Sequence, residues 1–309
     1  YLERYSKNEN DQKEEVTLHG PTTVNQLDPI KLEEAINAAK NSDMAIIFAG
    51  SNRDYETEAS DRRDLKLPFG QEELIKKVLA VNPNTIIVMI AGAPFDLNEV
   101  EKNASTLVWS WFNGSEGGNA LADVLMGTVN PSGKLPWTMP KNIEDSPAHA
   151  TNSFPGDERV EYKEGILVGY RWFDTKNIDP LYPFGYGLSY TNFEFSDLKT
   201  NQKTYTSNDS IEVTFNIKNT GNVDGKEVIQ LYVSNPTSSV EKAAQELKGF
   251  KKIFVKSGTS EKVTIQLPLK ELAYYNIEKK EWIVETGTYN LKIGNSSRNI
   301  LKEISVTIK

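Results

Sequence analysis

Residues 85–91 have the sequence TIIVMIA, and this apolar run decides the fold of the first part of the chain. A run of this length, rich in β-branched residues and bounded by polar ones, is typical of a strand buried on both faces of a parallel sheet. Two similar runs lie on either side of it, at residues 44–49 (MAIIFA) and 106–111 (TLVWSW). Stretches that are typical of helices alternate with these runs, at residues 31–40, 71–80, 94–103 and 118–126. The alternation predicts βαβ units around a parallel sheet.

From residue 193 onward the pattern changes to short stretches in which apolar and polar residues alternate. Such stretches occur at residues 210–219, 227–234, 248–254, 261–267 and 287–293. Turn signals such as Thr220-Gly221-Asn222 separate them. This pattern predicts an antiparallel β-sandwich.

A segment rich in Pro, Gly, Tyr and Phe lies between the two patterns, at about residues 131–188. Connections of this length are uncommon in compact domains unless they serve a function or cover another surface. The fold class is therefore predicted to be α/β plus all-β, in three parts. We expect an α/β domain in residues 1–142, a connector in residues 143–190 and a β-sandwich in residues 191–309.

The composition is typical of a soluble globular protein, with 38% hydrophobic and 25% charged residues among 309. No run of about 18 apolar residues occurs, so we expect no transmembrane helix and no membrane partner. The net charge of −8 disfavours nucleic acid as a partner, because phosphate binding needs clustered Lys and Arg. The absence of Cys excludes disulfides, thiol catalysis and thiolate metal sites. With only His19 and His149 present, His-based metal sites and Ser-His-Asp triads are also disfavoured.

Four segments carry a more specific signal. Residues 56–71 read ETEASDRRDLKLPFGQ, and residues 111–140 read WFNGSEGGNALADVLMGTVNPSGKLPWTMP. Residues 162–190 read YKEGILVGYRWFDTKNIDPLYPFGYGLSY, and residues 219–250 read NTGNVDGKEVIQLYVSNPTSSVEKAAQELKGF. In this order, the four segments resemble glycoside hydrolase family 3 of the β-glucosidase type.

The resemblance implies a TIM-like barrel, then an α/β sandwich domain, then a fibronectin type III-like sandwich. It also implies that the barrel supplies an Asp nucleophile, and no counterpart of the barrel occurs in these 309 residues. Only about three strands of the α/β domain can be counted. We therefore expect a C-terminal portion, beginning inside a longer precursor and inactive by itself, whose partner is the barrel of the same or a neighbouring polypeptide.

Retaining glycosidases need two carboxyl groups about 5–5.5 Å apart, one as nucleophile and one as acid/base. Glu58 is our candidate acid/base, because it lies three residues before Asp61-Arg62, as in the E-G-x-D-R-like pattern of the family. Its segment follows the strand expected at residues 44–49, and open α/β sheets present their sites at the carboxyl ends of strands. Glu56 is the alternative. Without the resemblance, both would be read as surface acids of a charged loop.

The resemblance suggests further roles around this site. Asp61 and Arg62 are expected to brace the loop, rather than to contact sugar. Trp111 and Glu116 are candidate substrate-binding residues beside the pocket, although tight-turn structure explains the Asn113–Gly118 loop equally well. We expect no cofactor, because the glycines of this loop lack the G-x-G-x-x-G spacing of a phosphate-binding turn. We also expect no metal, because the chain has no Cys and only two His, far apart in sequence.

Aromatic residues form two other groups. Those of the connector are Tyr170, Trp172, Phe173, Tyr182, Phe184, Tyr186 and Tyr190, and packing between domains is favoured over a sugar platform. In the sandwich, Tyr274, Tyr275 and Trp282 are read as core or interface residues, with glycan binding as the alternative.

Two functional hypotheses follow. In the first, the assembled protein hydrolyses a terminal β-linked sugar of an oligosaccharide or glucoside with retention, and an extracytoplasmic location is expected because such enzymes are often exported. In the second, the chain alone is a non-catalytic accessory or glycan-binding module.

Overall fold

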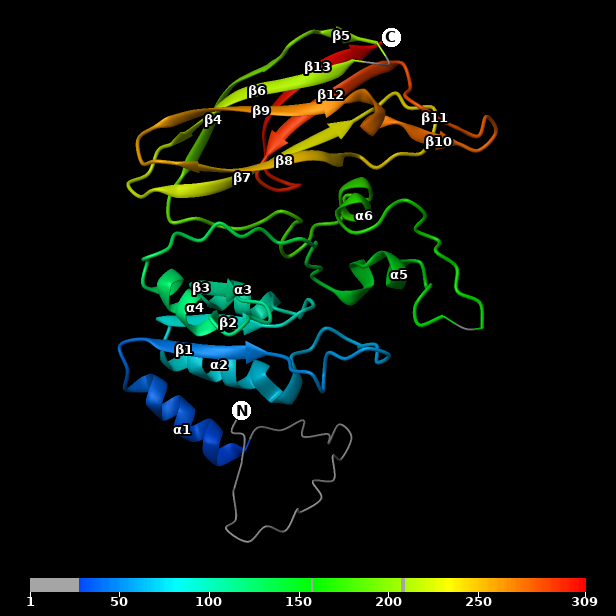
Figure 1. Ribbon diagram of the computed structural model, residues 1–309. Coiled ribbons are helices and arrows are strands. Elements are labelled where there is room, and N and C mark those ends of the chain that lie inside the picture. Colours follow the sequence, from blue (N-terminus) through cyan, green and yellow to red (C-terminus); the bar gives the residue numbers. More distant parts are fainter. Residues whose placement is uncertain (1–27, 157, 207–208) are drawn as a thin grey trace, which may run out of the picture.

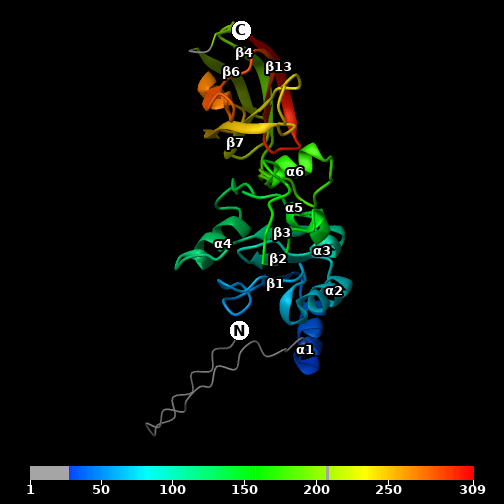
Figure 2. The same cartoon turned by 90° about the vertical axis from the view of Figure 1, so that its right-hand side faces the viewer.

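A computed structural model describes residues 28–156, 158–206 and 209–309, so His19 lies outside the described residues. Two layered units are stacked along one axis, and the connector lies between them (Figures 1 and 2). The first contains a parallel sheet with helices, and the second is an antiparallel sandwich. The predicted α/β plus all-β fold class is confirmed. No helix in the described part of the chain is long and apolar enough to span a bilayer.

The parallel sheet has the strand order β1 (Ala45–Gly50), β2 (Thr85–Ile90) and β3 (Thr106–Trp109). In register, Ala45 lies opposite Thr85, and Ile86 lies opposite Thr106. The helices of this unit are α1 (Pro29–Lys40), α2 (Gln71–Val81), α3 (Asn98–Asn103) and α4 (Gly117–Leu125). Figure 2 shows α2 and α3 on one side of the strands and α4 on the other.

The core of the first unit lies between the sheet and helices α1, α2 and α3. It contains side chains from each of these elements, including Ala39, Ile75, Val78, Ile87, Met89 and Val100. Helix α1 begins two residues before the predicted range of 31–40, because Asp28 accepts a hydrogen bond from the backbone N–H of Ile30 and Pro29 occupies the first turn.

The helix expected at residues 94–103 begins later, at Asn98. The segment before it is held away from helical geometry by the loop that follows β1, because the N–H of Asp96 donates to the carbonyl of Leu65. The fully buried side chains of Phe95 and Leu97 fix this segment further. Tertiary packing therefore overrides the local helical pattern.

The second unit is a two-sheet sandwich. Its five-stranded sheet has the order β5 (Thr204–Tyr205), β13 (Ile300–Ile308), β12 (Gly287–Gly294), β7 (Gly225–Ser234) and β8 (Glu246–Val255). Its three-stranded sheet has the order β4 (Phe193–Thr200), β6 (Ser210–Asn219) and β9 (Ser260–Pro268). A separate hairpin pairs β10 (Tyr274–Asn276) with β11 (Glu281–Ile283). Alternating buried residues of both sheets form one core.

The connector contains two short helices, α5 (Pro147–Ala150) and α6 (Tyr170–Thr175). Tyr170, Trp172 and Phe173 of α6 are buried, and the Tyr170 ring lies 4.8 Å from Phe184 and 5.8 Å from Tyr232 of β7, centroid to centroid. The Tyr170 hydroxyl also accepts the N–H of Leu247 in β8. These aromatic side chains therefore pack the connector against the sandwich.

A buried ion pair links the first unit to the second. Lys134 Nζ, from the loop after α4, lies 2.9 Å from Glu227 Oε1 of β7, and both side chains are at most 10% exposed. Lys134 Nζ also donates to the Gly187 carbonyl. Near it, Asn130 Nδ2 donates to the carbonyl of Asp224. Arg298 of the sandwich binds three groups of the connector, which are the Asp174 carboxylate and the carbonyls of Phe173 and Ile178.

Replacing Lys134 with Met will destabilise the chain by about 3 kcal/mol, because it leaves the Glu227 carboxylate buried without its cation. The measurement is the free energy of unfolding from urea titration. Lys141→Met is the matched control, since the Lys141–Asp179 pair is 3.8 Å long and solvent-exposed. That variant is expected to lose at most about 0.5 kcal/mol. Equal losses in the two variants would contradict this account of the link.

Candidate active site

The candidate site lies at the carboxyl ends of β1 and β2. The acidic loop, residues 51–66, leaves β1 at this edge and extends to the right in Figure 1. Two turns on neighbouring strands, at Ser51 after β1 and at Gly92 after β2, form the base of this loop. This is the edge at which parallel sheets generally present functional side chains.

Glu56 joins these two turns. Its Oε1 accepts a hydrogen bond from Ser51 Oγ at 2.5 Å, and its Oε2 accepts the backbone N–H of Gly92 at 3.0 Å. A Cβ at Gly92 would lie 2.7 Å from Glu56 Oε2 and 3.0 Å from the Phe112 ring. The absence of a side chain at position 92 therefore lets the carboxylate reach the backbone. We call this arrangement the Glu56 bridge.

The start of the loop is fixed by Gly50 and Gln71. The Gln71 carboxamide accepts the N–H of Gly50 at 2.7 Å and donates to the carbonyl of Gly50 at 2.8 Å. Gly50 has φ of 136°, and a Cβ there would lie 2.0 Å from the Ile90 carbonyl oxygen. Only glycine fits this close approach of β1 to β2.

Arg62 fastens the second half of the acidic loop. Its Nη2 donates to the carbonyl of Pro94 at 2.6 Å, and its guanidinium lies 4.5 Å from the centroid of the Phe95 ring. The Tyr55 ring stacks on the same Phe95 ring, with 6.1 Å between the ring centroids. Burial raises the pKa of the Tyr55 hydroxyl, and the nearby Asp64 carboxylate adds to the effect. Asp61 is exposed and forms no hydrogen bond or ion pair within the described part of the chain, so the bracing contacts come from Arg62.

Glu58 lies at the outer end of the loop. Its side chain is exposed, and it takes part in no hydrogen bond or ion pair with another described residue. An isolated β-bridge between Thr57 and Ser60 closes the turn that carries it. Ala59 in this turn has φ of 62°, a conformation that favours glycine. The family pattern quoted above has glycine at this position, where this chain has alanine in the same region of backbone conformation that glycine favours.

Trp111 and Glu116 lie after β3, on the same edge of the sheet. Trp111 has φ of 60°, and its ring lies 4.6 Å from Trp137 and 6.1 Å from Trp109, centroid to centroid. Its ring is thus half-buried in a tryptophan cluster. Glu116 is exposed and accepts a hydrogen bond from Asn119 Nδ2. Their roles in substrate binding stay predictions.

Sequence reasoning missed the residues that hold the loop, which are Ser51 at its start and Gln71, Gly92, Pro94 and Phe95 outside it. Gly92 alone had a recognisable signal, because it stands between two alanines directly after a buried strand. The described residues contain no group of three or more His, Asp and Glu side chains that could hold a metal ion. The chemistry offered here is that of exposed carboxyl groups, those of Asp54, Glu58 and Asp61, on a firmly held loop.

Comparisons with known proteins identify the family and agree with the fold. The model of the glycosyl hydrolase family 3 C-terminal domain matches residues 5–190, and that of the fibronectin type III-like domain matches residues 227–297. The chain is 44% identical to thermostable beta-glucosidase B of Acetivibrio thermocellus over 91% of its own length and 37% of that protein. It therefore spans little more than a third of the length of this relative.

Solved structures give the same result. The GH3 beta-glucosidase of Bifidobacterium adolescentis superposes with a TM-score of 0.86 at 39% identity, over 91% of this chain and 41% of that one. The beta-glucosidase of Kluyveromyces marxianus in complex with glucose gives 0.85 at 39% identity, over 92% of this chain and 33% of that one.

The two glutamates are expected to differ in their effect on stability. Glu56→Ala removes the acceptor of two hydrogen bonds and will lower the free energy of unfolding by about 1–3 kcal/mol. Glu58→Ala, the matched control on the same loop, will change it by at most about 0.5 kcal/mol, because the side chain is exposed. Urea titration measures both. A Glu58→Ala variant that is destabilised as strongly as Glu56→Ala would show that the bridge is misassigned.

Proposed function

Because the chain belongs to glycosyl hydrolase family 3, we propose that it supplies the general acid/base of a retaining β-glycosidase, with Glu58 in that role. The substrate class is a terminal β-linked sugar of an oligosaccharide or glucoside, by analogy with the beta-glucosidases above. The nucleophile is an Asp of a barrel domain outside these 309 residues.

The observation that carries the proposal is the difference between the two glutamates of the acidic loop. An acid/base carboxyl must reach the leaving-group oxygen and then a water molecule. Both oxygens of Glu56 are engaged by Ser51 and Gly92, which favours an anchoring role. Glu58 is exposed and free of described partners, at the end of a loop held by Glu56 and Arg62.

The proposal divides the site between two bodies. A retaining mechanism needs a second carboxyl group about 5–5.5 Å from the acid/base. It also needs an acid whose pKa is raised, and covering a carboxyl group with another protein surface raises its pKa by removing water. The barrel would meet both requirements, by bringing the nucleophile and by enclosing the loop. In the catalytic cycle, Glu58 then gives its proton to the departing oxygen and later takes one from the water that attacks the glycosyl-enzyme.

The isolated chain is expected to show no turnover of an aryl β-glucoside, since it has no nucleophile. Activity should appear when the barrel is supplied, in the same polypeptide or as a separate partner. Turnover by the chain alone, after purification from a host without family 3 enzymes, would contradict the division of the site.

In the full-length protein, Glu58→Ala is expected to lower kcat/KM on substrates with poor leaving groups by at least about 100-fold, because proton transfer contributes that much. With activated aryl glycosides, whose leaving group departs without acid assistance, added azide should restore turnover and give a β-glycosyl azide, since a small anion can attack the glycosyl-enzyme without base catalysis. Glu56→Ala is the matched control and should show no azide rescue. Rescue of Glu56→Ala in place of Glu58→Ala would transfer the acid/base role to Glu56.

A further inference from the structure

The hairpin of β10 and β11 exposes a pair of aromatic rings that the proposed active site does not use. Tyr275 and Trp282 lie opposite each other in register, and their ring centroids are 5.6 Å apart at an interplanar angle of 66°. Tyr275 is 48% exposed and Trp282 is 71% exposed. The core and interface roles expected for these two side chains are therefore not seen within the described residues.

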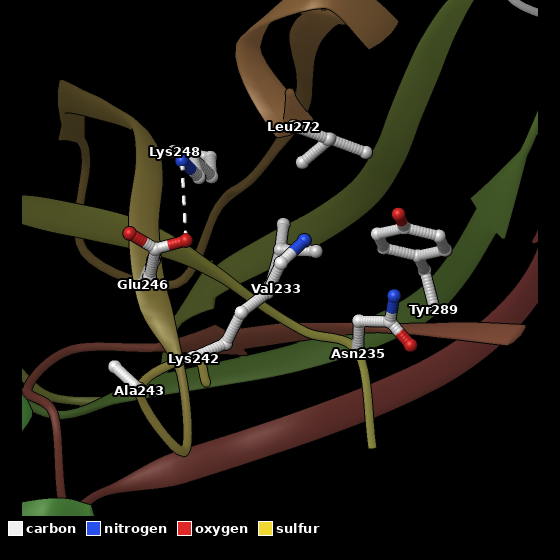
Figure 3. A pocket seen from close by; sticks show the side chains of 8 residues that line it. All are labelled: Val233, Asn235, Lys242, Ala243, Glu246, Lys248, Leu272 and Tyr289. Carbon is white, nitrogen blue, oxygen red and sulfur yellow. Dashed lines mark ion pairs between the residues drawn. The ribbon is translucent and has the colours of Figure 1, made fainter. Parts of the chain in front are cut away.

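The opposite face of the hairpin is fixed to the sandwich. Lys242 Nζ lies 5.5 Å from the centroid of the Tyr274 ring and 6.0 Å from that of Tyr289. Figure 3 shows Lys242 and Tyr289 among the side chains that line a small pocket beneath this region. Lys242 Nζ also lies 3.2 Å from Glu285 Oε2. Lys242 thus connects the hairpin to the sandwich, because it contacts Tyr274 of the hairpin as well as Tyr289 and Glu285.

Glu285 holds this anchor in its charged form. Its carboxylate accepts hydrogen bonds from Ser238 Oγ and from the N–H and hydroxyl of Ser239. Burial would raise the pKa of Glu285, but these hydrogen bonds outweigh it and lower the pKa to about 2. The ion pair with Lys242 therefore persists at ordinary pH, and the two exposed rings are presented on a preorganised support.

The size of the exposed pair indicates the kind of ligand. Two aromatic side chains with these exposures offer on the order of 200–300 Å². A stable protein interface needs about 800 Å² from each partner. The turn that joins the two strands, Ile277-Glu278-Lys279-Lys280, has both charge signs and does not favour a charged ligand. A neutral ring with an apolar face and polar edges fits: its C–H face covers an aromatic ring, and its hydroxyls reach the polar turn.

We propose that Tyr275 and Trp282 form a second carbohydrate-binding surface, outside the active site, for β-linked gluco-oligosaccharides. The choice of sugar class rests on the proposed function, because a β-glycosidase encounters such chains. A flat β-linked chain exposes the faces of its pyranose rings, and these faces would stack on the rings of Tyr275 and Trp282. The surface would hold a polymer near the enzyme without taking part in bond cleavage.

The experiment is a titration of the isolated chain with cellotetraose, followed by isothermal calorimetry and by NMR of the indole N–H groups. Saturable binding is expected, with the Trp282 indole signal among those that shift. Trp282→Ala and Tyr275→Ala should each weaken binding roughly tenfold, as expected for removal of a stacking partner. Maltotetraose, whose α-linked chain is curved, should bind more weakly than cellotetraose.

Phe250→Ala is the matched control, since Phe250 is 70% exposed on β8 of the same domain. It should bind cellotetraose like the parent chain, and all variants should keep the parent melting temperature. Absence of saturable binding, or an equal loss in Phe250→Ala, would overturn the proposal. So would sedimentation data showing that Trp282→Ala abolishes self-association, because the rings would then be a protein interface. Glu58→Ala should bind cellotetraose normally, so this proposal and the acid/base assignment fail separately.

Discussion

The Glu56 bridge is the contact on which the candidate site depends. The loop that carries Glu58 leaves one strand and would be free to move without a connection to the next. Glu56 supplies that connection, because one oxygen binds Ser51 after β1 and the other binds Gly92 after β2. Hydrogen bonds to a carboxylate are about twice as strong as neutral ones, so one side chain can fix the base of the loop. Arg62 then fastens the far half at Pro94.

The same reasoning explains why two acids so close in sequence differ in use. Positions 56 and 58 are both glutamate, and alternation alone would place them on the same side of an extended segment. The chain is not extended here, because residues 53–55 form a turn in which the N–H of Glu56 donates to the carbonyl of Asn52, and a second turn at residues 58–59 is closed by the bridge between Thr57 and Ser60. Glu56 is consequently drawn back to the sheet, while Glu58 stays exposed. The buried Lys134–Glu227 pair joins the first unit to the sandwich, and the packing of α6 joins the connector to it.

Much of the fold could be predicted from periodicity. The runs at residues 44–49, 85–91 and 106–111 all became parallel strands, because short apolar runs between helical patterns have few other uses. The pattern failed where distant contacts decide the structure. Residues 94–97 look helical but are kept out of the helix by the hydrogen bond to Leu65 and by the burial of Phe95. Helix α6 was not predicted within the aromatic connector. Its three buried rings pack against the connector as well as the sandwich, so they do not form a simple helical pattern in the sequence.

The site was harder to predict than the fold. The sequence singled out Glu58, Glu56 and Arg62 through a resemblance, and in the structure Glu56 and Arg62 hold the loop while Glu58 is exposed. The sequence could not indicate that Ser51 and Gly92 hold Glu56, or that Pro94 holds Arg62. These partners lie up to 36 residues away and have no motif of their own. Tyr275 and Trp282 were assigned to packing, since a sequence does not show which face of a short hairpin is covered.

The central claim is that Glu58 transfers the proton to the leaving group. The most direct measurement is the dependence of kcat/KM on the leaving-group pKa, for a series of aryl β-glucosides and the full-length protein. We predict a shallow dependence for the parent and a steep one for Glu58→Ala, because unassisted departure leaves the full negative charge on the phenolate oxygen. An unchanged slope in Glu58→Ala would contradict it.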